Sequence, residues 1–452
     1  MESQWQAHVL VLNPTGNVPG VYSITIQTQM ISTHEGLEIG LRCPRCHSEY
    51  PADEDLAGCP KCASSAPVNL LATYATNGRR SRSLKSRWDG RPPGMWRYAE
   101  CLPVEASAAV TLGEGGTPLI ECPDLGKAIG LPRLMLKNES ANPTWSFKDR
   151  LASVGVSWAK AVGRGGIVLS SSGNAGAAAA AYAARAGLPC LILTTKSFPA
   201  AMRGLMTSYG AMVVATESPR DRWTLNRAVA KEWGWLPLSN MADPPVGSHP
   251  VASEGHKTIA FEIAQSLSWH VPDAVIVPVA YGDALAGIHR GFRELRELGM
   301  CGREPRLVAA EAYGSLSLAL ADGAESPVAT DGTGSLAYSA AAPLSTYQAL
   351  AALRENDGHA TVVGNDEALA AQGRLARSEG IFVEISSALT LAAAIKLAAD
   401  GVLKPEDRVV LLITSGGLKD LGVGRVESEI PIVSPDLADL GSALDKHFGF
   451  RA

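Results

Sequence analysis

From residue 111 onward, short apolar segments alternate with alanine-rich ones, and this alternation limits the fold more than any other feature of the sequence. The apolar segments are short and bounded by turn-forming residues, as strands are, whereas the alanine-rich segments are long enough for helices. Strands that alternate with helices form βαβ units around a mostly parallel sheet. We therefore expect an α/β fold, with strands at 133–139, 166–172, 189–195, 211–216, 273–280, 306–312 and 408–415 and helices at 147–162, 175–187 and 254–267.

The 452 residues suffice for two or three domains of ordinary size. A cysteine-rich segment and a charged segment marked by Pro and Gly precede the alternating region. The expected parts are an N-terminal extension (1–40), a zinc ribbon (41–66), a connector (67–110), a large domain (111–160 and 246–430), a small α/β domain (161–245) and a C-terminal tail (431–452).

Charge and composition exclude several classes of function. The formal net charge is -5 with both signs interleaved, so we expect neither nucleic acid nor a membrane surface as a partner. The first residues lack a positively charged segment ahead of a long apolar run, and no stretch is apolar enough to span a bilayer. We expect a cytoplasmic protein that acts on a small molecule.

Four of the eight cysteines form two Cys-x-x-Cys pairs, Cys43 with Cys46 and Cys59 with Cys62. This spacing is typical of a zinc ribbon, in which four thiolates surround Zn²⁺ tetrahedrally. Four protein ligands leave no open position on the metal, so the expected role is structural. The alternative is four reduced cysteines without a metal.

Lys148 stands at the start of the helix expected at 147–162, just after a turn that contains Pro143. Beside Trp145 and Phe147, and near the positive end of a helix, Lys148 would tend towards the neutral amine that a Schiff base requires. Taken alone, this segment is equally compatible with an ordinary surface lysine.

Three further segments place small and hydroxyl residues directly after expected strands. Segments 170–176 and 277–287 each lead into a helix, whose N-terminus suits an anionic group. Segment 411–420 contains paired glycines, which let a flat ring approach the backbone closely. Ligands of parallel sheets bind at the carboxyl ends of strands, although each segment alone could be a plain turn.

Together and in this order, the motifs resemble the threonine synthase family of fold-type II pyridoxal-phosphate (PLP) enzymes. The resemblance implies two open, twisted α/β domains with PLP in the cleft between them, a PLP-binding large domain and a homodimer. Some members also carry a zinc ribbon ahead of the catalytic region. The motifs are GEGGTPL (113–119), NPTWSFKDR (142–150), SSSGNAGAAAAAYAARAG (170–187), EGHKTIAFE (254–262), GIFVEISSA (380–388) and TSGGLKD (414–420).

The resemblance assigns roles to individual residues. Lys148 matches the lysine that forms the Schiff base and moves protons, and Asn174 matches the residue that hydrogen-bonds the ring hydroxyl of PLP. Thr414 matches the hydroxyl partner of the pyridine nitrogen, with Ser415 as its substitute if the alignment slips by one. A neutral partner makes the ring a weaker electron sink, which favours elimination and replacement. The loop whose backbone would hold the cofactor phosphate consists of Ala280, Tyr281, Gly282, Asp283 and Ala284.

The sequence departs from the family on the substrate side. Trp145 stands where the family usually has glycine, and Ala252 replaces the arginine that clamps the substrate phosphate. In the phosphate loop, Tyr281 and Ala284 replace two asparagines, and Asp283 places an acid beside an anion. The cofactor is therefore better supported than the substrate. The residues expected to contact substrate are Lys137, Trp145, Ser171 and Ser172, with Arg203 and His256 as further candidates whose alternative is a surface or capping role.

Three functions remain open from the sequence. The first is a lyase of threonine synthase type, which converts O-phospho-L-homoserine to L-threonine and phosphate. The second keeps PLP and Lys148 but performs β-elimination or β-replacement on another, non-phosphorylated amino acid. The third is a non-catalytic scaffold or regulator, which the retention of Lys148 and Asn174 disfavours.

Overall fold

The computed structural model describes residues 39–52, 54, 57–64, 67–74, 81–196, 198–421, 423 and 430–451. All seven expected strands and all three expected helices form. The strands are β5 (Arg133–Asn138), β6 (Ile167–Ser170), β7 (Cys190–Thr195), β8 (Met212–Thr216), β10 (Ala274–Val279), β11 (Arg306–Glu311) and β13 (Arg408–Ile413). The helices are α3 (Lys148–Ala161), α4 (Asn174–Ala186) and α8 (Lys257–Ser266), the last preceded by the 3-10 turn η4 (Glu254–His256).

The larger sheet has six strands in the order β12-β11-β10-β13-β5-β4. All neighbours are parallel except the edge strand β4 (Leu119–Glu121), which runs antiparallel to β5. Strand β12 (His359–Val362) forms the other edge. The central strands β10 and β13 are apolar and almost wholly buried, as strands covered on both faces are.

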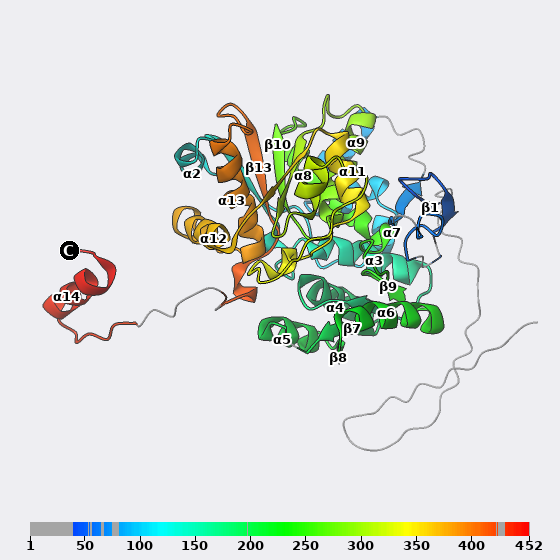
Figure 1. The fold of residues 1–452 in the computed structure, drawn as a ribbon, viewed down its shortest axis with the longest axis horizontal. Helices are drawn as coiled ribbons and strands as arrows, with labels where there is room; N and C mark the ends of the chain where they lie inside the picture. The colour runs from blue at the N-terminus through cyan, green and yellow to red at the C-terminus, as the bar shows by residue number, and fades with distance from the viewer. Residues whose placement is uncertain are drawn as a thin grey trace, which may run out of the picture. The chain divides into compact units, whose positions relative to one another are not determined.

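The second sheet is parallel, with the order β8-β7-β6-β9, where β9 is Leu236–Pro237. Figure 1 shows α4, α5 and α6 gathered around this sheet, and α8, α9 and α13 around the six-stranded one. The other helices are α1 (Ser81–Asp89), α2 (Pro123–Ala128), α5 (Ala200–Ser208), α6 (Pro219–Trp233), α7 (Pro250–Ser253), α9 (Asp283–Glu297), α10 (Ser315–Ala321), α11 (Tyr347–Glu355), α12 (Asn365–Glu379), α13 (Ile385–Ala399) and α14 (Leu437–Phe448), and the short 3-10 turns are η1 (Met95–Cys101), η2 (Ala106–Ala108), η3 (Glu139–Ala141), η5 (Tyr338–Ala340) and η6 (Gly417–Lys419).

The cysteine-rich segment carries a small antiparallel sheet of β1 (Ile39–Arg42), β2 (Glu49–Pro51) and β3 (Leu71–Tyr74). Strand β3 lies inside the expected connector, beyond residue 66, because that sheet needs a third strand. This strand is tied to the catalytic part of the chain. The Tyr74 hydroxyl donates to Glu254 Oε2 at 2.6 Å, and Arg290 Nη2 donates to the carbonyl of Ala72 at 2.7 Å.

The sheets draw on separate parts of the sequence. Strands of the six-stranded sheet come from 119–138 and 274–413, and those of the four-stranded sheet from 167–237. Contacts group Glu38–Ala452 into one unit, so the proposed domain boundaries stay predictions. Nearly all of the predicted N-terminal extension lies outside the described residues, and the predicted tail contains α14. Within the described ranges, no helix has the length and apolarity that crossing a bilayer requires.

Candidate functional site

The turn before α3 places Lys148 at the carboxyl end of β13. The amide of Phe147 donates to the carbonyl of Thr414 at 3.0 Å, which docks the turn on the segment that follows that strand. Lys148 is half-buried, and its Nζ lies 4.6 Å from the centre of the Phe147 ring. Burial lowers the pKa of Lys148, although the Asp283 carboxylate opposes this effect. The amine therefore reaches its neutral, nucleophilic form more easily than an exposed lysine does.

Trp145, which the sequence places next to Lys148, has an unusual backbone conformation. Its backbone has φ 57°, in the left-handed region that glycine adopts without cost, which explains why glycine suits this position. Its side chain is 47% exposed. Of the two aromatic neighbours expected around Lys148, Phe147 packs against the amine and Trp145 lies at the surface.

Asn174 links the segment that follows β6 of the four-stranded sheet to the segment that follows β13 of the six-stranded sheet. It is the first residue of α4, and its Oδ1 accepts hydrogen bonds from Lys419 Nζ at 2.6 Å and Ser415 Oγ at 3.3 Å. Its Nδ2 donates to Glu384 Oε2 at 2.7 Å. Burial lowers the pKa of Lys419 to about 8, and the Glu384 carboxylate opposes this shift. Sequence reasoning assigned no role to Lys419 or Glu384, although both lie in the motifs after β12 and β13.

The hydroxyls of Thr414 and Ser415 differ in availability. Ser415 has no exposed surface, and its Oγ donates to the carbonyl of Trp145 at 3.0 Å. The Thr414 hydroxyl lies 2.8 Å from Ser387 Oγ, at the start of α13. A single neutral partner leaves Thr414 with further hydrogen-bonding capacity. Thr414 is therefore the better partner for a ring nitrogen, and Ser387, which sequence reasoning missed, orients it.

The loop 280–284 joins β10 to α9 and presents the N-terminus of that helix. Gly282 has φ 93°, and a Cβ there would lie 2.3 Å from the Cβ of Ala349, so this position requires glycine. The first N–H groups of α9 have no intrahelical acceptors and suit a phosphate. The Asp283 carboxylate accepts hydrogen bonds from the amide and hydroxyl of Ser248 at 3.0 and 2.7 Å and from Gln348 at 3.3 Å. The acid that seemed misplaced beside an anion is thus held by donors of the protein.

The two serines expected to contact substrate are partly occupied by the protein. Ser171 Oγ accepts from the amides of Gly173 and Gly176 at 3.2 and 3.0 Å and so caps the start of α4. Ser172 is buried, and its Oγ lies 2.9 Å from Thr194 Oγ1 and 3.3 Å from Arg222 Nη1. A direct contact of either serine with substrate stays a prediction.

The predicted substrate contact at Lys137 is wrong. Lys137 has no exposed surface, and its Nζ donates to Glu262 Oε2 at 2.6 Å and to the carbonyl of Thr117 at 2.7 Å. Arg150, two residues after Lys148, bridges Glu262 and Glu139 with bonds of 2.6 to 2.8 Å. This buried network of Lys137, Glu139, Arg150 and Glu262 holds α3 from behind. The charge of Lys137 therefore neutralises a buried carboxylate and is not available to a substrate.

The further candidates His256 and Arg203 differ in their burial. His256 has no exposed surface, and its ring stacks on Phe147 with 5.2 Å between ring centres. Burial and the charges of Lys148 and Arg150 hold the pKa of His256 well below its usual range, so the ring is neutral. Arg203 is exposed on α5. His256 thus supports Phe147 from behind.

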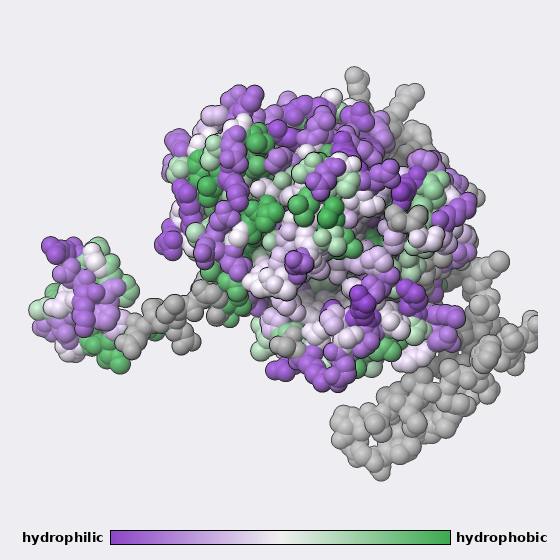
Figure 2. Space-filling model, in the orientation of Figure 1, coloured by the Kyte–Doolittle hydropathy of each residue, from purple (hydrophilic) through white to green (hydrophobic). Residues whose placement is uncertain are grey.

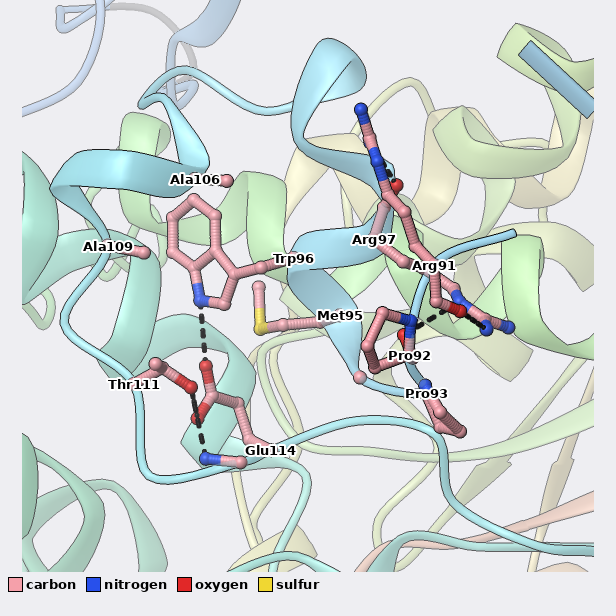
Figure 3. A pocket seen from close by; sticks show the side chains of 12 residues that line it. Arg91, Pro92, Pro93, Met95, Trp96, Arg97, Ala106, Ala109, Thr111 and Glu114 are labelled. Atoms are coloured by element: carbon pink, nitrogen blue, oxygen red, sulfur yellow. Dashed lines mark hydrogen bonds between the residues drawn. The ribbon is translucent and has the colours of Figure 1, made fainter. Parts of the chain in front are cut away.

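A separate cavity of about 240 Å³ lies beside the GEGG motif (Figure 3). Glu114 in its wall accepts hydrogen bonds from Trp96 Nε1 and the Tyr182 hydroxyl, both at 2.8 Å. Arg91 in the same wall pairs with Glu100 at 2.6 Å. Since these charges are already partnered, we take the cavity as support for the loop rather than as the reaction site.

The four predicted zinc ligands lie together, with all their sulfurs within 4.8 Å of one another. The Sγ atoms of Cys43 and Cys62 are 3.8 Å apart, and those of Cys46 and Cys59 are 3.6 Å apart. Zn–S bonds of about 2.3 Å in a tetrahedron separate sulfurs by about 3.8 Å. The donor set therefore fits zinc.

The donors around Lys148 likewise fit PLP, because they comprise an amine of lowered pKa, an amide, a hydroxyl and a free helix N-terminus. Comparisons with known proteins agree. Residues 110–415 match the family model described as "Pyridoxal-phosphate dependent enzyme". The threonine synthase of Methanocaldococcus jannaschii is 35% identical over 398 residues, which cover 86% of this chain and 95% of that protein. The threonine synthase of Methanosarcina acetivorans is 36% identical over 388 residues, which cover 84% and 92% of the two chains.

Solved structures show the same fold. The chain is similar to maize serine racemase, with a TM-score of 0.57, 22% identity and coverage of 68% of this chain and 90% of that one. It is also similar to the processed form of threonine deaminase isoform 2 from Solanum lycopersicum, with a TM-score of 0.57, 22% identity and coverage of 68% and 84%. The fold is thus that of the fold-type II PLP enzymes. By the family match, the relatives and the placement of Lys148, the chain belongs to the family of pyridoxal-phosphate-dependent enzymes, as a relative of the threonine synthases.

Proposed function

We propose that the protein is a PLP-dependent carbon–oxygen lyase of threonine synthase type. The observation that carries this proposal is the half-buried Lys148 amine, whose pKa is lowered and which stands at the start of α3 within the segment joined to Asn174 and Thr414. The likeness to threonine synthases over most of the chain supports it.

Each residue of the site has a task in this chemistry. PLP, when bound, withdraws electrons from the Cα of an amino acid attached to it. The neutral amine of Lys148 accepts the Cα proton and returns a proton later. Asn174 would hydrogen-bond the cofactor ring, and Lys419 and Glu384 fix its amide from both sides. The first turn of α9 would hold the cofactor phosphate, and Thr414 would offer a neutral hydroxyl to the ring nitrogen.

The substrate that the relatives' name suggests is O-phospho-L-homoserine. In a threonine synthase, phosphate leaves from Cγ and water adds at Cβ, which yields L-threonine and phosphate. Incubation of the PLP-loaded protein with O-phospho-L-homoserine tests this directly. We expect equal amounts of phosphate and threonine, and none from Lys148→Ala. A PLP-loaded protein that releases neither product would contradict the proposal.

A second candidate is β-elimination or β-replacement on an amino acid without a phosphate, and one observation favours it. Ala252, where the family has its phosphate-binding arginine, has no exposed surface, and its Cβ would lie 2.9 Å from a Cβ added to Gly155. Position 252 thus faces α3. Formation of a 2-oxo acid and ammonia from L-serine or L-threonine, in the absence of activity on O-phospho-L-homoserine, would establish this candidate.

We also propose that Cys43, Cys46, Cys59 and Cys62 hold a structural zinc ion. The separations of their sulfurs support it, and the ties from β3 to Glu254 and Arg290 make the ribbon part of the folded core. Metal analysis should find one zinc per chain, and a strong chelator should lower the melting temperature. A protein without zinc and with an unchanged melting temperature after chelation would contradict this.

The remaining proposals concern the working state. We infer a cytoplasmic homodimer that binds neither nucleic acid nor membrane, with large-domain boundaries at 111–160 and 246–430 and a small domain at 161–245. The family resemblance and the interleaved charges support these inferences. Light scattering on the purified holoenzyme would give twice the chain mass.

A further inference from the structure

The arginine that the family uses to bind the substrate phosphate is replaced here by Ala252. Another arginine, Arg222, lies near the start of α6. Ser218 and Asp221 form a capping box that fixes the start of this helix. The next residue, Arg222, is half-buried, and its Nη1 donates to Ser172 Oγ at 3.3 Å. Ser172 stands two residues before Asn174, so the guanidinium lies beside the segment that meets the cofactor ring.

The charge of Arg222 is not neutralised by the protein. Its Nε donates to the carbonyl of Pro219 at 3.3 Å, and among the described residues no carboxylate lies within ion-pair distance of it. Arg220, two residues earlier, is 78% exposed at its side chain and pairs with Asp243 at 3.2 Å. A partly buried guanidinium without a carboxylate is unusual, because burial of a charge costs free energy unless an anion compensates it.

Arg222 also lies near the loop 280–284. Burial raises the pKa of Tyr281 in that loop, and the Arg222 guanidinium opposes the rise, which requires the two side chains to lie near each other. Arg222 comes from the four-stranded sheet's side and Tyr281 from the six-stranded one. Figure 2 shows the surface hollowed between these two parts, with polar residues at the rim.

We propose that Arg222 is the specificity-determining residue of this enzyme and binds the acidic side-chain group of its amino-acid substrate. This inference rests on the proposed function, and it names the substrate class as amino acids with a phosphate or carboxylate on the side chain. A guanidinium can bind either anion through two parallel hydrogen bonds. Arg222 thereby replaces, from the other sheet, the arginine that is absent at position 252.

The test follows the absorption band of the bound cofactor during titration with O-phospho-L-homoserine, L-glutamate and L-homoserine. In Arg222→Gln, we expect the half-saturating concentration of the anionic ligand that the wild type prefers to rise about 10- to 100-fold, because a hydrogen-bonded charge is lost. Neutral L-homoserine should shift less than about threefold, by the same reasoning. Arg220→Gln, the matched control, should behave as the wild type. Arg222→Lys, which keeps the charge but loses the fork, should lie between wild type and Arg222→Gln and serves if Arg222→Gln does not fold.

The outcomes separate the two claims. Preference of the wild type for O-phospho-L-homoserine identifies phosphate as the group bound, and preference for L-glutamate identifies carboxylate. Equal shifts for neutral and anionic ligands, or no shift in Arg222→Gln and Arg222→Lys, would overturn the role of Arg222 while leaving the lyase proposal intact. A wild type that prefers L-homoserine overturns it as well. If no amino acid perturbs the cofactor band, the lyase proposal fails and this inference fails with it.

Discussion

Two charged regions of the molecule are built on opposite principles. Behind Lys148, the network of Lys137, Glu139, Arg150 and Glu262 pairs every charge in the interior, with side chains at most 5% exposed. Arg222, which contacts Ser172, instead has no carboxylate partner among the described residues, and the Trp145 side chain is 47% exposed. The paired charges of the interior network fix the position of the Lys148 amine. The guanidinium of Arg222, without a carboxylate, is available to bind an anionic ligand. The open side can therefore change its substrate without loss of the cofactor.

The largest effect should come from the lysine itself. Lys148→Ala removes both the nucleophile for PLP and the acceptor of the Cα proton, so we expect turnover to fall by about 10³-fold or more. The Schiff-base absorption band should disappear with it. Lys160→Ala, at the exposed end of the same helix, is the control. Residual turnover near the wild-type rate would remove Lys148 from the chemistry.

Substitution of Glu262 disrupts the buried network most directly. In Glu262→Gln, Arg150 and Lys137 lose a carboxylate that both contact, and we expect the free energy of unfolding to fall by about 3 to 5 kcal/mol. Burial raises the pKa of Glu262, but Arg150 and Lys137 outweigh burial and hold that pKa well below its usual range. The carboxylate thus contributes its full stability at neutral pH and loses it progressively as the pH falls below its ordinary pKa of 4.5.

Urea unfolding of the holoenzyme at neutral pH measures this effect. The control is Glu367→Gln, since Glu367 is exposed and pairs with Lys396 at 3.3 Å. We expect at most about 1 kcal/mol there. Similar losses in both variants would show that the buried network is no more important than a surface ion pair.

The predictability of the fold differs between long and short elements. Strands such as β10 and β13 are continuous apolar runs, and the sequence predicts them because burial on both faces demands such runs. Strands β4 and β9, of three and two residues, escape prediction because they carry no period that a sequence could display. Strand β3 of the ribbon also escapes prediction, because its pairing with β1, and no local pattern, makes it a strand.

The site was predictable where a motif is local. Lys148, the 280–284 loop and Thr414 lie in turns whose residue types point to their roles. Glu384 and Lys419 act through contacts that span 210 and 245 positions to Asn174, and no local pattern displays these. Lys137 was misjudged because a sequence does not show whether a lysine faces a buried carboxylate or a cleft.

A pH series sharpens the comparison at Lys419, which lies between the two sides. Its pKa in the folded protein is about 8, below the ordinary value of 10.5, so the unfolded state binds more protons between these values. Lys419 therefore makes the free energy of unfolding rise with pH across that window. Relative to Lys419→Gln, the wild type should gain about 1 to 2 kcal/mol between pH 7.5 and 9.5. Subtracting the free energy of unfolding of Lys419→Gln from that of the wild type cancels the contributions of the other titrating groups. A difference that does not change with pH would contradict the lowered pKa of Lys419.

The smallest effect is expected at Trp145, on the open side. Trp145→Gly relieves a left-handed backbone conformation but gives the unfolded chain more freedom, so the free energy of unfolding should change by no more than about 1 kcal/mol. Trp145→Ala also loses the indole but keeps the backbone cost, and it should be less stable than Trp145→Gly by about 1 kcal/mol. Thermal unfolding of both variants isolates the backbone contribution. If alanine is as stable as glycine, the backbone at 145 costs nothing, and the tryptophan is held there by its side chain. If glycine is the more stable and the cofactor band is unchanged, the indole is dispensable for cofactor binding.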